Sequence, residues 1–187
     1  MTDHSAALRR ELCALVDSRR DEFLELLRAF LRIRSVNPPG DMREAAGFVR
    51  GVLDRFGVPY RTLAAREEMP NIVGRWEAGA PGPTLVLNGH MDVFPVSNEW
   101  LWQAETKDGK IYGRGASDMK TGTLAGILAY CLLHSYRDRL KGALTLTVVS
   151  DEQSGGRYGT KFLFENHADE IAGDCCLNGE PSGLETL

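Results

Sequence analysis

The first third of the chain carries apolar residues at helical spacing. Between residues 5 and about 34, leucine, valine and phenylalanine recur every three or four positions, with charged residues on the opposite face. This pattern predicts one long amphipathic helix or two shorter ones. The segment "SVNPPG" at residues 35–40 ends the pattern, because paired prolines cannot continue a helix. Another helix is expected over about residues 42–56.

After Gly57 the pattern changes to short β segments that alternate with helices. Strands are expected around residues 60–63, 71–76, 84–88, 143–149 and 174–177, and helices around residues 121–134 and 158–166. Two of these strands, 84–88 and 143–149, are nearly continuous apolar runs, which is typical of strands buried on both faces. The alternation predicts an α/β domain with helices layered on both faces of one sheet. A chain of 187 residues suffices for one such domain.

Composition and charge exclude several classes of protein. The chain is 43% hydrophobic and 26% charged, as in an ordinary globular domain. Its net charge of -4 and scattered basic residues indicate no nucleic-acid partner. No apolar run approaches the roughly 20 residues that cross a bilayer, so we expect no membrane association and a cytoplasmic location. The cysteines lack a metal-binding spacing and are expected to be reduced and mostly buried: Cys13, Cys131, Cys175 and Cys176.

Polar residues follow three of the predicted strands. "NGHMD", "SDEQSGG" and "NGEPSG" each stand just past the carboxyl end of a strand. Ligands of open α/β sheets bind at that edge, so we expect these loops to converge there. The glycine-rich stretch "GRGASDMKTG" lacks the spacing of a phosphate-binding loop, and the chain has no G-x-S-x-G elbow of a serine hydrolase.

Each polar candidate also has a plainer interpretation. Asp92 could fix the tautomer of His90 for metal binding, although a loop histidine bonded to its neighbour is commoner. Asp118 precedes a predicted helix, where an aspartate most often caps the helix. Asp151, Glu152 and Gln153 could form a solvated acidic turn, or Glu152 could act as a base beside a metal.

The remaining candidates are weaker. Glu180 precedes a proline that restricts its backbone to extended conformations, which by itself is weak evidence for a site. The other histidines (His4, His134 and His167) have no carboxylate partner nearby in the pattern, and surface or core roles are expected.

Taken in order, four segments resemble the signatures of one family of cocatalytic zinc hydrolases. These segments are "LNGHMDVFP", "DGKIYGRGASDMKTG", "VVSDEQSGGRYGT" and "NGEPSG". The family includes aminoacylases, acetylornithine deacetylase, succinyl-diaminopimelate desuccinylase and carboxypeptidase G. The resemblance implies that residues 1–187 form the N-terminal part of a helix/sheet/helix catalytic domain, without its lid or dimerisation domain. It also implies a homodimeric full-length form and small-molecule substrates, namely N-acyl amino acids or small peptides.

The resemblance also implies a role for the polar residues. His90 matches the histidine ligand of one metal, with Asp92 behind it, and Asp118 matches the aspartate that bridges two metals. Glu180 matches the carboxylate that completes the shell of the metal held by His90. The Asp118–Met119 peptide corresponds to a bond that is cis in such enzymes.

Two features depart from the family pattern. The residue after the expected general base, Glu152, is normally a glutamate that ligates the second metal, and here it is Gln153, whose neutral amide should hold Zn²⁺ less firmly. The chain also ends at Leu187, before the segment that normally supplies a last histidine ligand. We therefore expect one firmly held zinc ion and a weak second position. Cobalt or manganese would also suit such an oxygen-rich site.

The expected activity is metal-dependent hydrolysis of an amide bond next to a free carboxylate. The metal would polarise the carbonyl and lower the pKa of water toward roughly 7, while Glu152 transfers the proton to the leaving amine. Arg114, Arg157 and Asn178 are unranked candidates for the substrate carboxylate. The chain by itself is expected to be inactive, and the alternative is a non-catalytic metal-binding or regulatory fragment of the same fold.

Overall fold

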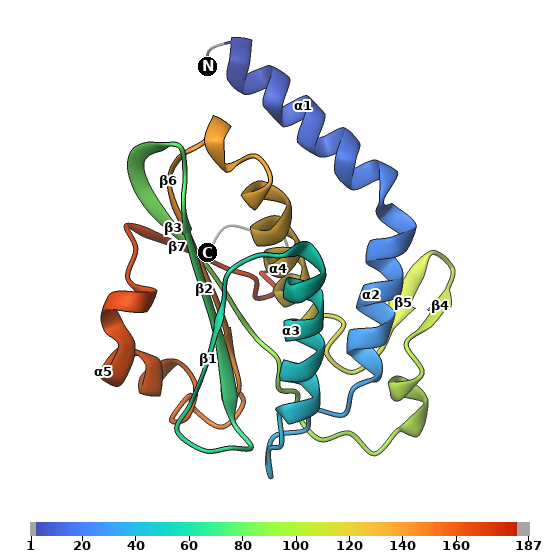
Figure 1. The fold of residues 1–187 in the computed structure, drawn as a ribbon. Helices are drawn as coiled ribbons and strands as arrows, with labels where there is room; N and C mark the ends of the chain where they lie inside the picture. Colours follow the sequence, from blue (N-terminus) through green and yellow to red (C-terminus); the bar gives the residue numbers. More distant parts are fainter. Residues whose placement is uncertain (1–2, 183–187) are drawn as a thin grey trace.

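The computed structural model describes residues 3–182. The amphipathic N-terminal run forms two helices, α1 (Asp3–Ser18) and α2 (Arg20–Arg32), with a break at Arg19 (Figure 1). α2 buries Phe30 and Leu31 at its carboxyl end. α1 continues past the body of the molecule, and Glu11 in α1 forms an ion pair of 2.9 Å with Arg139. Of the two arrangements expected from the sequence, the shorter pair of helices is therefore observed.

The centre of the molecule is a mixed five-stranded sheet with the strand order β1-β2-β6-β3-β7. Its strands are β1 (Arg61–Ala64), β2 (Pro70–Glu77), β3 (Ala80–His90), β6 (Lys141–Val149) and β7 (Cys175–Asn178). β3, β6 and β7 run parallel, whereas β2 is antiparallel to both β1 and β6. The three parallel strands therefore end at the same edge of the sheet.

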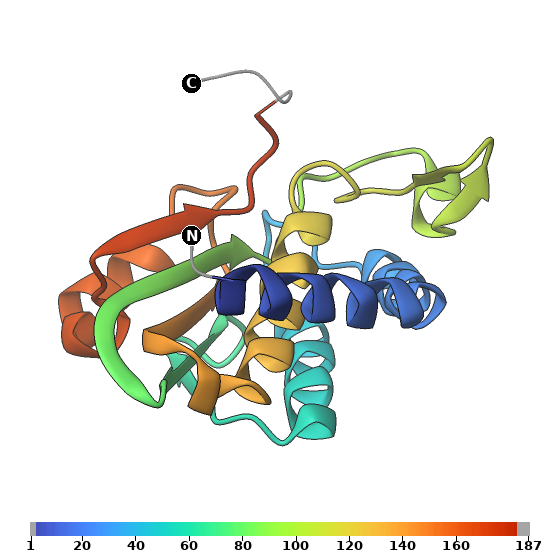
Figure 2. The ribbon, with the colours of Figure 1, turned by 90° about the horizontal axis from the view of Figure 1, so that it is seen from above.

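Helices cover both faces of this sheet, which confirms the predicted α/β layering. Figures 1 and 2 show α3 (Arg43–Phe56) and α4 (Lys120–His134) on one face and α5 (Thr160–Ile171) on the other. The main core lies between α2, α3, α4 and the sheet. A smaller core lies under α5, where Leu163 and Ile171 pack against Val149 of β6.

Burial of the two central strands differs. β6 is buried along its length except at its first residue, as its apolar run predicts. β3 is longer than expected and buried mainly toward its carboxyl end, and its register with β6 shifts between Ala80 and Thr84. The buried half of β3 is the part that leads to the polar loops.

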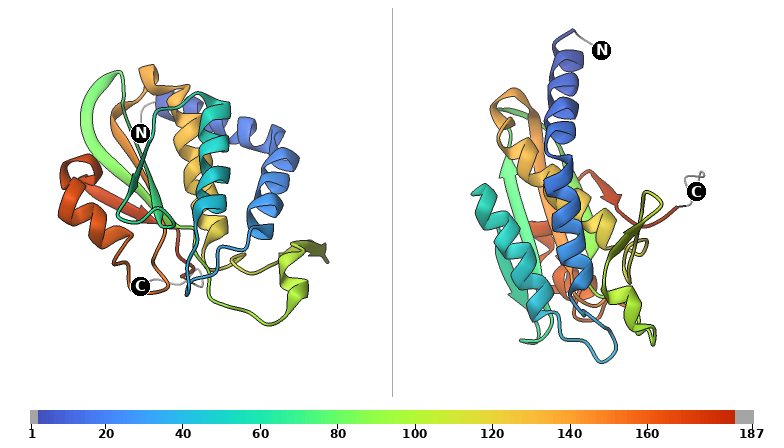
Figure 3. Two further views of the ribbon diagram at one scale, coloured as in Figure 1. Left: turned by 60° about the horizontal axis from the view of Figure 1, so that its bottom comes forward. Right: turned by 90° about the vertical axis from the view of Figure 1, so that its right-hand side faces the viewer.

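The sequence did not predict a small hairpin, β4 (Glu105–Lys107) and β5 (Lys110–Tyr112), joined by a turn at Asp108 and Gly109. Both turn residues have positive φ, as a two-residue hairpin turn requires. The hairpin stands away from the central sheet (Figure 3) and contacts α2 through Arg28, which donates to Thr106. Strands this short and exposed carry no apolar alternation that would reveal them.

Burial of the cysteines differs from the prediction. All four cysteines are free, but only Cys131 is buried, whereas Cys13, Cys175 and Cys176 are exposed. Cys175 and Cys176 lie on the edge strand β7, whose residues are all exposed. Among the described residues, no helix combines the length and apolar character needed to cross a bilayer.

Candidate metal centre

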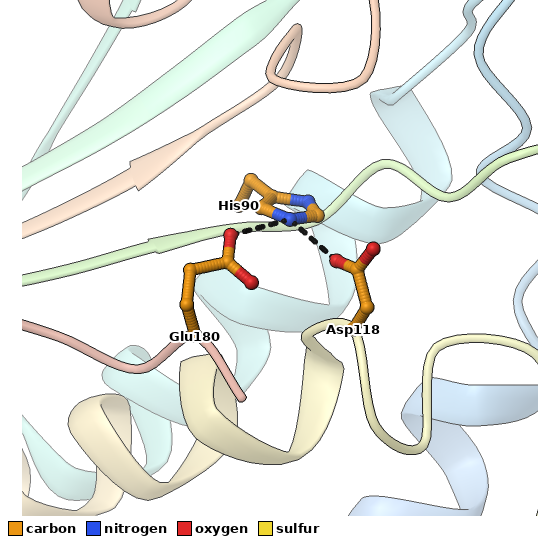
Figure 4. A group of neighbouring side chains, drawn as sticks. All are labelled: His90, Asp118 and Glu180. Carbon is orange, nitrogen blue, oxygen red and sulfur yellow. Dashed lines mark hydrogen bonds and ion pairs between the residues drawn. The ribbon is translucent and has the colours of Figure 1, made fainter. Parts of the chain in front are cut away.

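The three polar loops converge at the carboxyl ends of β3, β6 and β7, as the strand order requires. His90 is the last residue of β3 and lies in register with Val149, the last residue of β6. Glu180 follows β7, and Asp118 lies in the loop before α4. Donor atoms of His90, Asp118 and Glu180 all lie within 4.8 Å of one another (Figure 4). The structure thus brings three of the four predicted metal ligands together, and the fourth, Gln153, contacts Asp118.

The spacing of these donor atoms suits one metal ion. Nε2 of His90 lies 3.0 Å from Oδ1 of Asp118 and 3.2 Å from Oε1 of Glu180. Ligand atoms on a tetrahedral zinc ion lie roughly 3.3 Å apart, given Zn–N and Zn–O bonds of about 2.0–2.2 Å. The His90 side chain is 1% exposed and the Asp118 side chain 52% exposed, so the cluster is anchored in the core and open to solvent on one side.

The second ring nitrogen of His90 is held by Asp92. Nδ1 lies 2.9 Å from the backbone oxygen of Asp92 and 3.2 Å from its Oδ1. Donation from Nδ1–H to these oxygens leaves Nε2 facing Asp118 and Glu180, which is the arrangement of a metal-binding imidazole.

The buried carboxylate of Asp92 also holds the loop after β6. It accepts the backbone N–H of Glu152 at 3.2 Å and that of Gln153 at 2.9 Å. The side-chain amide of Asn37 donates to Asp92 at 2.8 Å and to Asp151 at 3.0 Å. Sequence reasoning missed Asn37, whose place in "SVNPPG" gives no sign of these partners. Asp92 therefore links β3 to the loop that carries the candidate base.

In the acidic turn after β6, one side chain supports the turn and two face the metal cluster. Asp151 is buried and accepts the backbone N–H of Tyr158 at 2.9 Å, so it supports the turn rather than joining the metal cluster. Glu152 is 51% exposed, and its Oε2 lies 3.6 Å from Nε2 of His90. Gln153 donates from Nε2 to both carboxylate oxygens of Asp118, at 3.2 Å each. Glu152 and Gln153 therefore both face the cluster.

Asp118 does not cap α4. The residue before the helix is Met119, and no side-chain cap is present. The Asp118 carboxylate instead meets His90 and Gln153, so the helix-cap interpretation is wrong. The Asp118–Met119 peptide is cis, as the family resemblance implies.

Glu180 is positioned by a close approach of two glycines. Gly122 in the first turn of α4 lies against Gly179, so that a Cβ added at Gly122 would overlap the backbone oxygen of Gly179. Gly179 N donates to the backbone oxygen of Asn88 in β3 at 3.2 Å. These contacts place Glu180 beside the start of α4, next to Asp118.

Lys120 attaches the start of α4 to the end of α2. Its side chain is fully buried, and Nζ donates to the backbone oxygens of Phe30 at 3.0 Å and Ile33 at 2.7 Å. Burial lowers the pKa of the Lys120 amine to about 7, and the negative charges of Glu44 and Asp92 oppose this only in part. Nothing in the sequence marks this lysine as buried.

The electrostatics of the cluster favour a cation. Burial lowers the pKa of His90, but the hydrogen bond and charge of Asp92, with the charges of Glu180 and Glu152, outweigh it and raise this pKa to about 9. Burial raises the pKa of Glu180, with contributions from Asp118 and Glu152, while His90 opposes the shift. The gathered carboxylates therefore stabilise positive charge at Nε2 of His90, whether a proton or a metal ion.

The three candidates for a substrate carboxylate do not join this cluster. The backbone N–H of Arg114 donates to Leu101, and its Nε is buried without a partner among the described residues. Arg157 lies over the ring of Tyr158, at 5.4 Å from its centroid. Asn178 accepts a hydrogen bond of 3.3 Å from Asn88. Their role in binding stays a prediction.

The other histidines also lie outside the cluster. His134 packs edge-on against Trp76, with ring centroids 5.7 Å apart. Nδ1 of His167 lies 3.0 Å from Oε1 of Glu170, so the expected lack of a carboxylate partner is wrong for this residue. The side chain of His4 lies outside the described residues.

The fold and the cluster together define an α/β domain with a candidate metal centre at the carboxyl ends of its parallel strands. The model of Peptidase family M20/M25/M40 matches residues 86–187, which is more than half of the chain. The chain belongs to this family.

Curated relatives agree with this assignment. An uncharacterized metallohydrolase of Methanococcus maripaludis is 32% identical over 171 residues, which cover 81% of this chain and 41% of the relative. The succinyl-diaminopimelate desuccinylase of a Wolbachia pipientis strain is 30% identical over 172 residues, which cover 88% of this chain and 42% of the relative. The chain thus spans about two fifths of the length of these relatives.

Solved structures share the fold. An M20 family metallo-carboxypeptidase from Sulfolobus solfataricus superposes with a TM-score of 0.72 at 23% identity, over 84% of this chain and 37% of that one. A dinuclear metal-binding M20 peptidase from Bacillus subtilis superposes with a TM-score of 0.64 at 15% identity, over 87% of this chain and 43% of that one. At these identities the likeness shows the fold alone.

Proposed function

We propose that His90, Asp118 and Glu180 hold a zinc ion that serves the hydrolysis of amide bonds in N-acyl amino acids or small peptides. The observation that carries this proposal is the meeting of their donor atoms, within 4.8 Å of one another, at the carboxyl ends of the strands. Membership of the M20/M25/M40 family and the names of its relatives, a desuccinylase and a carboxypeptidase, support the substrate class. Cobalt or manganese would suit the same oxygen-rich ligands.

Each polar residue would have a separate task. A zinc ion supplies Lewis-acid polarisation of a carbonyl and lowers the pKa of water. Glu152, half exposed and 3.6 Å from Nε2 of His90, would take a proton from the attacking water and deliver it to the leaving nitrogen. Asp92 would keep His90 and the backbone of Glu152 in fixed relative positions, because it contacts both.

We also propose that residues 1–187 form the N-terminal part of a metallohydrolase catalytic domain. Its support is that the chain spans 41% and 42% of the two curated relatives while 81% and 88% of the chain itself is matched. A homodimeric longer form and a cytoplasmic location stay predictions of the same kind.

A second candidate function is a non-catalytic metal-binding or regulatory module. The observation in its favour is Gln153, whose amide group donates to both oxygens of Asp118. A neutral amide at this position gives the site less negative charge than a carboxylate would. Such a module would bind zinc without turning over substrate.

A hydrolysis assay separates the two candidates. The zinc-loaded chain, and any longer protein in which it occurs, is incubated with a panel of N-acyl amino acids and dipeptides. The first candidate predicts release of amino acid that chelation abolishes and that Glu152→Gln lowers by roughly 10²–10⁴-fold without loss of bound zinc. Zinc binding without hydrolysis by either protein favours the second candidate. Hydrolysis that survives both chelation and Glu152→Gln contradicts the first.

A further inference from the structure

We infer that the metal centre binds a single ion, because the side-chain amide of Gln153 donates to both oxygens of Asp118, the carboxylate that a second ion would have to share. This inference rests on the proposed metal site and concerns its stoichiometry. The fold is shared with a peptidase described as dinuclear, so the residues present must be tested against a second ion.

A second ion would have to compete with Gln153 for the carboxylate of Asp118. Oδ1 faces Nε2 of His90 at 3.0 Å, on the side where the first ion would lie. Oδ2 has Gln153 Nε2 at 3.2 Å, and the same amide nitrogen lies 3.2 Å from Oδ1. A carboxylate that bridges two ions must give one oxygen to each. In this chain the second oxygen is already paired with an N–H donor.

Chemistry decides which end of the amide faces Asp118. The nitrogen of a glutamine amide donates and its oxygen only accepts, so an oxygen turned toward a carboxylate would be repelled. The backbone of Gln153 is also fixed, since its N–H donates to the buried Asp92 at 2.9 Å. To offer its oxygen to a second ion, the amide would have to turn over and break both bonds to Asp118.

The described residues also supply too little negative charge for a second ion. The first ion would have two carboxylates and an imidazole, from Asp118, Glu180 and His90. A second ion near Gln153 would share Asp118 and have Glu152, whose carboxylate faces the His90 side at 3.6 Å. Both oxygens of Asp151 already accept hydrogen bonds, from Asn37 and from the backbone N–H of Tyr158, which hold this carboxylate in the turn.

Zinc titration of the wild type and a charged variant tests this inference. We expect the wild type to retain one zinc per chain after dialysis, and Gln153→Glu to retain two, because the variant replaces an N–H donor with a carboxylate. Gln103→Glu is the matched control, since Gln103 is the only other glutamine in the chain and is exposed. This control should retain one zinc.

Two spectroscopic measurements on the wild type, amide proton exchange and ¹¹³Cd resonances, test the inference without any variant. In the zinc-loaded wild type, the side-chain amide protons of Gln153 should exchange more slowly with solvent than those of Gln103, because they stay bonded to Asp118. A cadmium-loaded sample should give one ¹¹³Cd resonance.

The outcomes separate this inference from the proposed function. Two ions on the wild type, two ¹¹³Cd resonances, or a Gln153→Glu variant that retains only one ion would each overturn the single-ion inference while leaving the metal site in place. Binding of no ion at all by the folded wild type would refute the proposed function itself.

Discussion

The carboxylate of Asp92 lies 3.2 Å from Nδ1 of His90 and also accepts the backbone N–H groups of Glu152 and Gln153. Burial works to raise the pKa of Asp92, but its hydrogen bonds to His90, Asn37 and Gln153 outweigh burial and lower this pKa. The carboxylate therefore stays ionised inside the protein. One buried acid orients the candidate metal ligand and holds the loop of the candidate base.

Replacing Asp92 should weaken zinc binding without removing a zinc ligand. In Asp92→Asn the amide no longer offers two acceptor oxygens to Nδ1–H and to the loop N–H groups, so His90 loses its fixed tautomer. Loss of such an outer partner typically costs about 10–100-fold in metal affinity. Isothermal titration calorimetry measures this affinity. Asp108→Asn in the exposed β4–β5 turn should bind like the wild type, and an unchanged affinity in Asp92→Asn would contradict the role given to Asp92.

Zinc affinity should rise with pH well above the ordinary range of histidine. In the metal-free protein His90 has a pKa raised to about 9, so a proton must leave Nε2 before zinc can bind. Below that pKa the apparent affinity should rise about tenfold for each pH unit, and it should level off above it. Competition titrations at pH 6, 7 and 8 would show this rise. A plateau already reached at pH 7 would mean that His90 titrates near its unperturbed value of about 6.5.

A methyl group at Gly122 should displace Glu180. In Gly122→Ala the added Cβ would overlap the Gly179 oxygen, so the loop after β7 must move away from α4. We expect zinc affinity to fall by more than about tenfold, because one of three ligands is shifted. Gly126→Ala is the control on the same helix, since its added Cβ would meet only Leu87 at 3.8 Å. The control should keep its zinc affinity and gain stability by about 0.5–1 kcal/mol.

Lys120 should stabilise the fold through its two hydrogen bonds. Lys120→Met removes the hydrogen bonds to the backbone oxygens of Phe30 and Ile33, which keep only the backbone N–H groups of Ile33 and Ser35, at a cost of roughly 1–3 kcal/mol for the two bonds together. At pH 8, above the Lys120 pKa of about 7, the amine is mostly neutral, so the change removes hydrogen bonds rather than a buried charge. Urea unfolding of the metal-free protein measures the loss. The exposed control Lys161→Met should change the free energy of unfolding by less than about 0.5 kcal/mol, and an equally small change at Lys120 would refute this account.

Much of the fold could be predicted because it follows from local patterns. The apolar run of β6 and the helical spacing of α3 and α4 each reflect which side of an element faces the core. Once the strands are placed, the convergence of His90 and Glu180 follows from their positions at the ends of parallel strands. The bounds of most elements were predicted to within a few residues for the same reason.

Other parts of the site depend on contacts that no local pattern encodes. Asn37 lies 55 residues from Asp92 in the chain, and Lys120 lies 90 residues from Phe30. The meeting of Gly122 with Gly179 likewise depends on how α4 packs against the end of β7. Asp118 illustrates the difference, since its local context indicates a helix cap and only the packed fold turns its carboxylate toward His90.

Zinc titration of the wild type beside His90→Ala tests the central claim most directly. His90 is the buried member of the cluster, and His134→Ala is a matched control, because His134 is half-buried against Trp76 outside the cluster. The account predicts one tightly bound zinc ion on the wild type and on His134→Ala, and at least a hundredfold weaker binding by His90→Ala. A wild type that binds no zinc, or a His90→Ala variant that binds it equally well, would contradict the account.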